Sequence, residues 1–237
     1  MQARACCSIG GGVAFTLDRK RRKARHARKA AHLQTQAWRA QVNPHFIHTA
    51  LQNINEYVQA NERDLASSFL TRFARLMRAV LENARKDEVS LQSDLDVLHD
   101  YLELEKARMH NGFTYSIDID TDLDPEEAMV PPMLLQPFAE EAIWKGLAKK
   151  QGAGHISITV RKRNGSLILA IEDDGMARPP DLHGGSAGPE ERTTGTAITA
   201  ARLELLSRQE GKPASVRSSP LPNGQRVELE LPMQTAA

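Results

Sequence analysis

The chain is poor in the residues that mark disulfide-rich and nucleic-acid-binding proteins. Only two of its 237 residues are cysteines, the adjacent Cys6 and Cys7. Neighbouring cysteines rarely bridge each other, so no disulfide framework is implied and a reducing compartment fits. Aromatic residues make up 5% of the chain and the formal net charge is +1. The molecule as a whole therefore carries no strong field for nucleic acid, and no recognition motif suggests direct binding to it.

Basic charge is instead concentrated near the amino terminus. RKRRKARHARK, Arg19 to Lys29, holds eight Lys or Arg residues and no acid. The apolar segment before it, ACCSIGGGVAF, is far shorter than the about 20 residues that cross a bilayer. Apolar residues followed by basic ones are typical of the cytoplasmic end of a membrane helix. We therefore expect residues 1–38 to combine the end of a membrane segment with a basic signalling helix. The open alternative is a disordered start followed by a solvated basic helix.

Three apolar stripes with spacings of three and four predict helices between residues 39 and 111. The stripes are Val42, Phe46, Ala50, Leu51, Ile54 and Val58; Leu65, Phe69, Phe73, Leu76, Val80 and Ala84; and Leu91, Leu95, Leu98, Leu102 and Met109. Ser90 is a good N-cap for the third helix. A hairpin with one added helix is too small to bury these stripes well alone, so we expect dimerisation into a bundle.

Strand and helix patterns alternate after Asn111-Gly112. The expected elements are the strand FTYSIDI, a helix from Pro131-Pro132 through Gly146, the hairpin HISITVRKRNGSLILAIEDD with its turn at Asn164-Gly165, the helix TAITAARLELL and a last hairpin turning at Asn223-Gly224. Asn-Gly is a strong hairpin signal. Helices mixed with antiparallel hairpins indicate an α+β sandwich, one sheet with helices on one face, over residues 112–237.

Two candidate sites lie on predicted helices. His45 follows Pro44 in RAQVNPHFIHTALQNI, although a proline inside a helix costs about 3 kcal/mol. The segment QPFAEEAIWKG places Glu140, Glu141 and Lys145 on one helix. Taken alone, Glu141 and Lys145 are spaced as a surface ion pair worth a few tenths of a kcal/mol.

Two further candidates lie where elements begin or end. Asp173-Asp174-Gly175 ends a predicted strand, and these residue types are common in turns. Gly195 opens a predicted helix in TTGTA, where free backbone N–H groups can receive a phosphate. Each of these signals is weak by itself, but their order along the chain is specific.

That order resembles the GHKL ATP-binding fold shared by histidine kinases, gyrase-type ATPases and Hsp90. Among these, QVNPHFIHTALQNI is similar to the phosphoacceptor box of the LytS/YehU-like sensor histidine kinases. The segments FLTRFARLMRAVLENARKDEVSLQSDLDVLHDYLELEKARM and VPPMLLQPFAEEAIWKGL continue the likeness. The resemblance covers roughly Gln41 to Pro232. It implies a dimerisation and phosphoacceptor part over residues 39–111, followed by a GHKL-type catalytic domain over 112–237.

The resemblance also implies roles for individual residues. His45 would accept the γ-phosphoryl group of ATP and pass it to an aspartate of a response regulator, of the LytTR type. The nucleotide site would comprise Glu140, Glu141, Lys145, Asp173, Gly175 and Gly195. The expected cofactors are ATP and Mg²⁺, with Glu141 as the metal ligand. The expected assembly is a homodimer at the cytoplasmic face of the bacterial cell membrane, with a membrane tether through the amino terminus.

Several positions depart from the family pattern. Glu141 stands where the family has the asparagine that holds Mg²⁺, and Asp174 and Ala177 alter the usual Asp-Asn-Gly-x-Gly. Glutamate is also a hard oxygen ligand, but it adds negative charge beside a triphosphate. Pro137 occupies the position of the glutamate that activates water in gyrase-type ATPases, which favours kinase chemistry over hydrolysis. The alternative is a catalytically impaired pseudokinase that acts as a dimeric signalling scaffold.

Overall fold

The structure is a computed structural model that describes residues 44–109, 112–150, 152–176, 194–210 and 213–235. The segment 1–38, with its expected basic helix, lies outside these ranges, as do residues 177–193. None of the described helices combines the length and apolar character that crossing a membrane requires.

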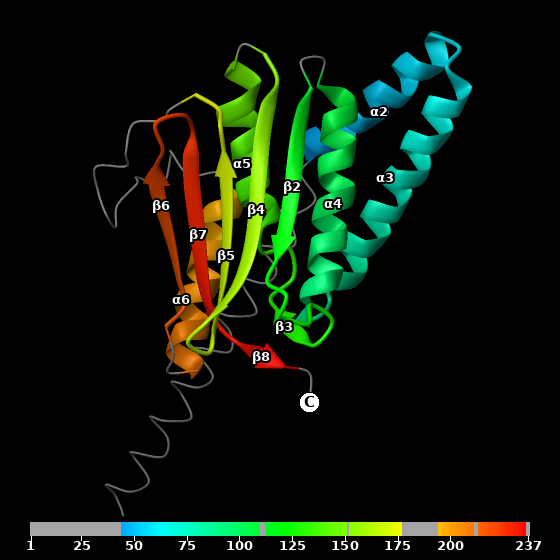
Figure 1. Cartoon of the computed structure of the whole chain (residues 1–237). Coiled ribbons are helices and arrows are strands. Elements are labelled where there is room, and N and C mark those ends of the chain that lie inside the picture. Colours follow the sequence, from blue (N-terminus) through cyan, green and yellow to red (C-terminus); the bar gives the residue numbers. More distant parts are fainter. Residues whose placement is uncertain (1–43, 110–111, 151, 177–193, 211–212, 236–237) are drawn as a thin grey trace, which may run out of the picture.

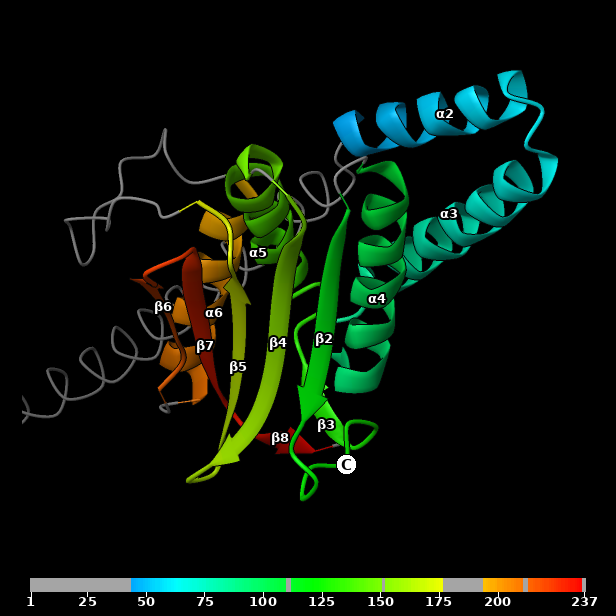
Figure 2. The ribbon, with the colours of Figure 1, turned by 45° about the horizontal axis from the view of Figure 1, so that its top comes forward.

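Two of the expected helices form an antiparallel hairpin. Helix α2 (Pro44–Gln59) and helix α3 (Arg63–Asn83) are joined by a tight turn in which Asn61 has a φ of 59°. The hairpin projects away from the sheet in Figure 2. Its inner side is held by aromatic contacts such as Tyr57 with Phe69, whose ring centroids are 5.9 Å apart. A set of large apolar side chains stays exposed on it: Leu51, Val58, Leu65, Leu70 and Leu81.

Helix α4 (Leu91–Arg108) lies between this hairpin and the sheet (Figure 1). The predicted N-cap is confirmed, because the Ser90 hydroxyl accepts a hydrogen bond of 3.2 Å from the Ser93 N–H. On one side, Arg75 of α3 donates through Nε to the buried Asp100 carboxylate at 2.6 Å. On the other side, α4 packs beside strand β2. Helix α4 thus contacts both parts of the chain, and the expected boundary near residue 111 stays a prediction.

A mixed five-stranded sheet forms the centre of the second part. Its strands run in the order β2 (Phe113–Ile119), β4 (Gly154–Arg163), β5 (Ser166–Asp173), β7 (Gln225–Pro232) and β6 (Ser215–Pro220). Of the neighbouring pairs in this sheet, β2 and β4 run parallel and the other three run antiparallel. Helices α5 (Gln136–Glu141) and α6 (Thr194–Glu210) cover one face (Figures 1 and 2). The predicted α+β fold class is confirmed by this arrangement.

Alternating side chains build the core of this sandwich. Ile156, Ile158 and Val160 of β4 are fully buried, while the residues between them are half-buried. The predicted turn at Asn164-Gly165 is confirmed, since both residues have positive φ values, 51° and 76°. A small second sheet, β1 (Val89–Ser90), β3 (Ala128–Val130) and β8 (Gln234–Thr235), closes one end of the molecule.

The helix expected to start at Pro131-Pro132 begins later, which corrects the sequence prediction. Met133 has a φ of 55°, and α5 starts only at Gln136. The physical reason is the buried carboxylate of Asp94 on α4, which accepts hydrogen bonds from the N–H groups of Met133 and Leu134. Beyond α5 the chain continues as a π-helix, η1 (Ala142–Gly146), and a 3₁₀ turn, η2 (Leu147–Lys149).

The turn before α5 should depend on Asp94. Asp94→Ala leaves two buried N–H groups and the largely buried Arg202 without this partner, so we expect a loss of about 3 kcal/mol in the free energy of unfolding. The matched control is Asp96→Ala on the exposed side of the same helix, which should change stability by less than about 0.5 kcal/mol. Urea unfolding of both variants measures the difference, and equal losses would contradict the assigned role.

Candidate active site

Two glycines bring the predicted site segments into contact. Gly175 follows β5, and a Cβ added to it would lie 2.5 Å from the backbone carbonyl carbon of Gly146. The N–H of Met176 also donates to the Gly146 carbonyl at 3.4 Å. The strand end with Asp173 therefore lies directly against the end of η1, which continues the helix carrying the paired acids. Only a residue without a side chain permits this approach.

Asp173 is held firmly at the end of β5. Its side chain is buried, and Oδ1 accepts a hydrogen bond from the Gly175 N–H at 3.1 Å. Its backbone is packed just as closely, because a Cβ on Gly224 would lie 1.7 Å from the Asp173 carbonyl oxygen. The predicted turn glycine of the last hairpin thus also fits against the candidate site. A buried carboxylate in a fixed position is suited to recognising a hydrogen-bond donor.

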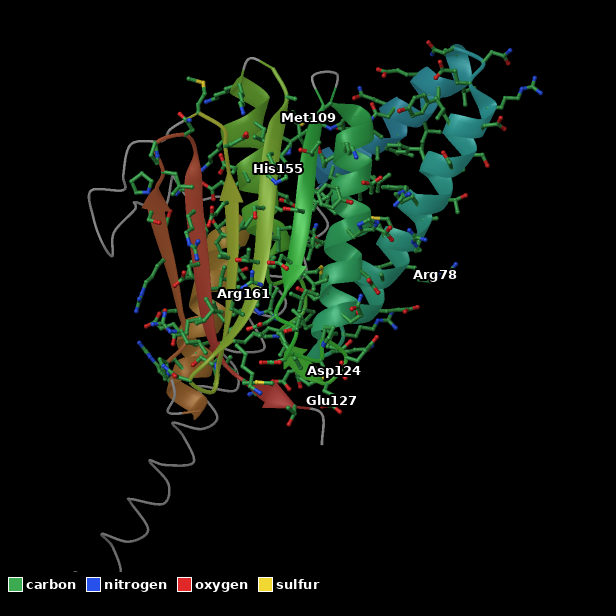
Figure 3. The ribbon with its side chains drawn as sticks, in the orientation of Figure 1. Arg78, Met109, Asp124, Glu127, His155 and Arg161 are labelled. Atoms are coloured by element: carbon green, nitrogen blue, oxygen red, sulfur yellow. The ribbon has the colours of Figure 1, made fainter. Side chains whose placement is uncertain are left out.

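Asp174 points to different partners. Its Oδ2 lies 2.8 Å from Lys150 Nζ, and its Oδ1 accepts from the His155 N–H at 2.7 Å. Burial raises the pKa of Asp174, but the hydrogen bonds from Lys150 and His155 outweigh it and hold the pKa below its usual value. Figure 3 places His155 at the same end of the molecule as Met109, with Arg161 towards the opposite end. The site therefore lies at the end of the sheet where β4 begins.

The paired acids of α5 occupy different environments. Glu140 is mostly buried, and burial raises its pKa to about 7; nearby Glu105 adds to the rise, while a hydrogen bond from Gln136 at 3.2 Å opposes it. Glu141 is half-buried and accepts from Lys145 Nζ at 2.7 Å. The ion pair expected from their spacing is therefore present. Lys145 thereby offsets the charge that glutamate brings to this position.

His45 and Gly195 are placed by their backbones. His45 lies in the first turn of α2, whose described part starts at Pro44, and the bend expected at Pro44 stays a prediction. The next residue, Phe46, contacts Tyr101 of α4 with ring centroids 5.4 Å apart. Gly195 is the second residue of α6, where N-terminal N–H groups point out of the helix.

Residues outside the sequence prediction also contribute to this region. Arg108 of α4 stacks its guanidinium on the Trp144 ring of η1 at 4.2 Å, and Glu105 of α4 is near enough to Glu140 to raise its pKa. The apolar stripe of α4 predicted only packing, because these residues come together through the fold. The one sequence feature that could have indicated this contact is Trp144 itself, because the chain has only two tryptophans.

The donor set fits a nucleotide better than a bare metal ion. The described residues contain no group of three or more His, Cys, Asp or Glu side chains arranged around a common point. Mg²⁺ bound together with a triphosphate needs only one or two carboxylates from the protein. Glu141 is the carboxylate available for that purpose, although its Oε1 is bonded to Lys145. Asp173 and the start of α6 would take the base and the phosphates.

Comparisons with known proteins find similarity to sensor histidine kinases. Residues 33–113 match the family model described as histidine kinase. The sensor protein LytS of Bacillus subtilis (strain 168) is 29% identical over 204 residues, which cover 85% of this chain and 34% of LytS. The chain is thus similar in sequence to sensor histidine kinases. The sensor histidine kinase YesM of the same organism is 28% identical over 201 residues, 84% of this chain and 33% of YesM.

The chain spans about a third of the length of these curated relatives. Among solved structures, it is similar to the histidine kinase domain of the blue-light activated histidine kinase from Erythrobacter litoralis EL346. That comparison has a TM-score of 0.49 and 16% identity, and it covers 86% of this chain and 94% of the other. Another similar structure is histidine kinase ThkA in complex with response regulator protein TrrA, with a TM-score of 0.46, 17% identity and coverage of 81% and 60%.

The close packing behind Asp173 gives a stability prediction. Gly224 and Gly165 both have positive φ, but only a Cβ on Gly224 meets the Asp173 backbone. Gly224→Ala should therefore cost about 2 kcal/mol more than Gly165→Ala, which carries the backbone strain alone. Thermal and urea unfolding of the two variants isolate the clash. Similar losses in both would show that Asp173 is not held in this way.

The pKa of Glu140 gives a pH prediction. Because the folded-state pKa of about 7 lies above the ordinary value of 4.5, the wild-type chain is relatively more stable below pH 4.5 and loses stability as pH rises through 7. Glu140→Gln removes that loss, so its stability relative to wild type should improve between pH 5 and pH 8, by on the order of 2 to 3 kcal/mol.

Urea unfolding at the two pH values, in a chelating buffer, measures this difference. The matched control is Glu82→Gln, which removes an exposed carboxyl group of α3. A Glu140→Gln effect that is the same at pH 5 and pH 8 would contradict the assignment of a buried, ionising carboxyl group.

Proposed function

We propose that this chain is the phosphoacceptor and catalytic part of a two-component sensor histidine kinase. It uses ATP to phosphorylate His45 and then passes the phosphoryl group to an aspartate of a response regulator of the LytTR type. One observation carries the proposal: the contact between Gly146 and Gly175 joins the acidic helix to Asp173. Helix α2 of the same chain bears Pro44-His45-Phe46, which supplies the proposed phosphoacceptor.

The proposed reaction is a displacement at the γ-phosphorus. A neutral ring nitrogen of His45 forms the P–N bond while the bond to the bridging oxygen breaks, and ADP leaves. Such transfers require alignment and charge stabilisation more than covalent chemistry by the protein. Asp173 would bind the adenine amino group, and the N-terminal N–H groups beside Gly195 would receive phosphate oxygens. Mg²⁺, held with help from Glu141, would supply charge neutralisation.

Dimerisation is part of the proposal. Leu51, Val58, Leu65, Leu70 and Leu81 are all exposed on the α2–α3 hairpin. Several large apolar side chains on one projecting hairpin form a surface that a second copy of the hairpin would cover in a four-helix bundle. We place this homodimer at the cytoplasmic face of the bacterial membrane, with the amino-terminal segment as the tether. The basic stretch after residue 18 supports that orientation.

A second candidate is a pseudokinase that acts as a dimeric scaffold. Two ion pairs favour it: Glu141 with Lys145, and Asp174 with Lys150. Both acids replace residues that are neutral in the family pattern, and each already has a cationic partner. Mg²⁺ would have to compete with Lys145 for the Glu141 carboxylate. The two candidates therefore differ in whether ATP and Mg²⁺ bind productively.

Incubation with γ-labelled ATP and Mg²⁺ tests the proposal. The wild-type protein should acquire acid-labile, base-stable label, because a phosphoramidate hydrolyses in acid. His45→Ala should abolish it, whereas the control His48→Ala, at an exposed position one turn later, should retain it. Asp173→Asn should reduce labelling by about 100-fold or more through weaker nucleotide binding. Label that persists in His45→Ala would exclude this phosphoacceptor.

If the chain is a pseudokinase, we expect the opposite result for labelling and nucleotide binding. The wild-type chain would then show neither label nor binding of a fluorescent ATP analogue. In that case, Glu141→Asn combined with Ala177→Gly tests whether these substitutions are responsible. Restored nucleotide binding in the double variant would identify them as the cause.

A further inference from the structure

The β4–β5 ladder is closed by a side chain at the end that carries the candidate site. The N–H of Asp174 donates to the His155 carbonyl at 3.2 Å, which continues the antiparallel pairing by one step. The return bond is different, because the N–H of His155 donates to Oδ1 of the Asp174 side chain at 2.7 Å. In a regular ladder two such residues exchange main-chain bonds in both directions. The Asp174 carboxylate thus takes the place of a main-chain carbonyl, and the backbone can leave the strand at this residue.

His155 is a firm anchor for this step. Its ring is held from strand β2, since Nδ1 lies 2.8 Å from the Thr114 hydroxyl and Nε2 lies 3.2 Å from the Ser116 hydroxyl. Thr114 and His155 are also paired across the parallel strands β2 and β4. The backbone groups that bind Asp174 therefore belong to the sheet itself.

The second oxygen of Asp174 reaches the segment that follows the π-helix. Its Oδ2 lies 2.8 Å from Lys150 Nζ. Lys150 ends the 3₁₀ turn η2, and its N–H donates to the Leu147 carbonyl at 2.9 Å. Helix η1, which ends at Gly146, directly precedes this turn. One carboxylate therefore ties both the start of β4 and the end of η2 to the exit of β5.

Asp174 stands between the two residues that build the candidate site. Before it in the chain, Asp173 is buried, and its Oδ1 accepts from the Gly175 N–H at 3.1 Å. After it, Gly175 lies so close to Gly146 that a Cβ would be 2.5 Å from the main-chain carbon. A shift at Asp174 would therefore move the residue proposed to bind adenine.

The ion pair is too exposed to contribute much to overall stability. The side chain of Asp174 is 44% exposed and that of Lys150 is 26% exposed. Pairs with such access to water usually add little to the free energy of unfolding. We therefore expect a local effect, on the direction in which the chain leaves β5.

A carboxylate offers an acceptor to both partners, whereas an amide does not. Asparagine, the residue of the family pattern, could accept from the His155 N–H through its oxygen. Its amide nitrogen would then face the Lys150 ammonium, and both groups are donors. The departure from the family pattern at Asp174 is thus matched by a lysine of this chain.

We propose that Asp174 is a positioning residue of the nucleotide site, which through Lys150 and the His155 backbone holds Asp173 in the orientation that binds the adenine amino group. This inference rests on the proposed kinase function and deepens it by giving a role to one departure from the family pattern. Its expected signature is a change in nucleotide affinity with little change in the transfer step or in global stability.

Asp174→Asn gives the sharpest test, because two physical effects predict opposite signs. Removal of a negative charge near a triphosphate would by itself tighten nucleotide binding. Loss of the Lys150 contact should instead raise the Kd for a fluorescent ATP analogue about fivefold, the equivalent of one hydrogen bond. Labelling of His45 at saturating ATP should stay within about twofold of wild type. The urea unfolding midpoint should remain that of wild type.

Lys150 supplies the partner test and a conservative rescue. Lys150→Met should weaken binding of the analogue to the same extent as Asp174→Asn. The double variant should be little weaker than either single variant, because both substitutions remove one shared interaction. Lys150→Arg keeps the ion pair, so its Kd should stay within about twofold of wild type.

The matched control is another pair of opposite charges on the same sheet. Asp118 of β2 pairs with Arg161 of β4, and Figure 3 shows Arg161 and His155 towards opposite ends of the molecule. Asp118→Asn removes the same charge without touching the candidate site. It should leave the Kd for the analogue unchanged.

Hydrogen exchange tests the arrangement without any nucleotide. The amides of Gly175 and Met176 donate to Asp173 Oδ1 and to the Gly146 carbonyl. Both should exchange about fivefold faster in Asp174→Asn, because local opening then costs less free energy. The control variant should exchange at the wild-type rate. Two-dimensional NMR of isotope-labelled protein follows the two amides.

The outcomes separate this inference from the proposed function. Equal or tighter binding by Asp174→Asn, or a matching loss in Asp118→Asn, would overturn the positioning role and leave the kinase intact. If the wild type binds no nucleotide, the proposed kinase fails, and the exchange rates then decide the role of Asp174. Faster exchange in Asp174→Asn and Lys150→Met alone supports that role, and unchanged exchange refutes it.

Discussion

The contact between the backbones of Gly146 and Gly175 is the constraint on which the candidate site depends. It brings the end of strand β5 against the end of η1, where any side chain would collide with main-chain atoms. Asp173 then comes to lie beside η1, which bears Lys145, the partner of Glu141 on α5. The neighbouring Gly224 extends the same constraint, because it lets the last hairpin pack on the Asp173 carbonyl. Close backbone packing, rather than side-chain contacts, thus brings the segments of the site together.

Buried polar groups set the positions of the helices around that contact. Asp94 of α4 accepts from two N–H groups of the turn before α5, and Arg202 of α6 donates to the carbonyl of Pro132 in the same turn at 3.0 Å. Unpaired polar atoms in an interior are costly, whereas paired ones fix an orientation. This one turn therefore fixes the positions of α4, α5 and α6 relative to one another. The sheet provides the support, and these few bonds determine where the functional helices begin.

The electrostatics of the site reflect its departures from the family pattern. Glu141 and Asp174 introduce carboxylates where the family pattern that the sequence resembles is neutral, and Lys145 and Lys150 lie at 2.7 and 2.8 Å from them. The added charges are thus locally balanced. In the proposed kinase the two lysines limit the repulsion between these carboxylates and a triphosphate. In the proposed scaffold the lysines neutralise the carboxylates in place of a metal ion. The same pairs support both candidates, so nucleotide binding distinguishes them.

The sequence by itself determined the periodic and local features of this protein. Apolar spacing predicted helices α2, α3 and α4, the alternation in FTYSIDI and HISITV predicted strands β2 and β4, and Asn164-Gly165 marked its hairpin turn. These features arise from neighbours along the chain, where hydrophobic period and turn chemistry act directly. The motif around His45 likewise suggested the resemblance to sensor histidine kinases.

Only the tertiary structure decided the features that depend on distant residues. The start of α5 at Gln136 rather than Pro132 follows from Asp94, which lies 39 residues before Met133. The π-helix, the contact between Phe46 and Tyr101, and the partners of Asp174 have no local signature. Burial and long-range hydrogen bonds outweigh local propensity at these places, because an unpaired polar group in the interior costs more than an irregular turn.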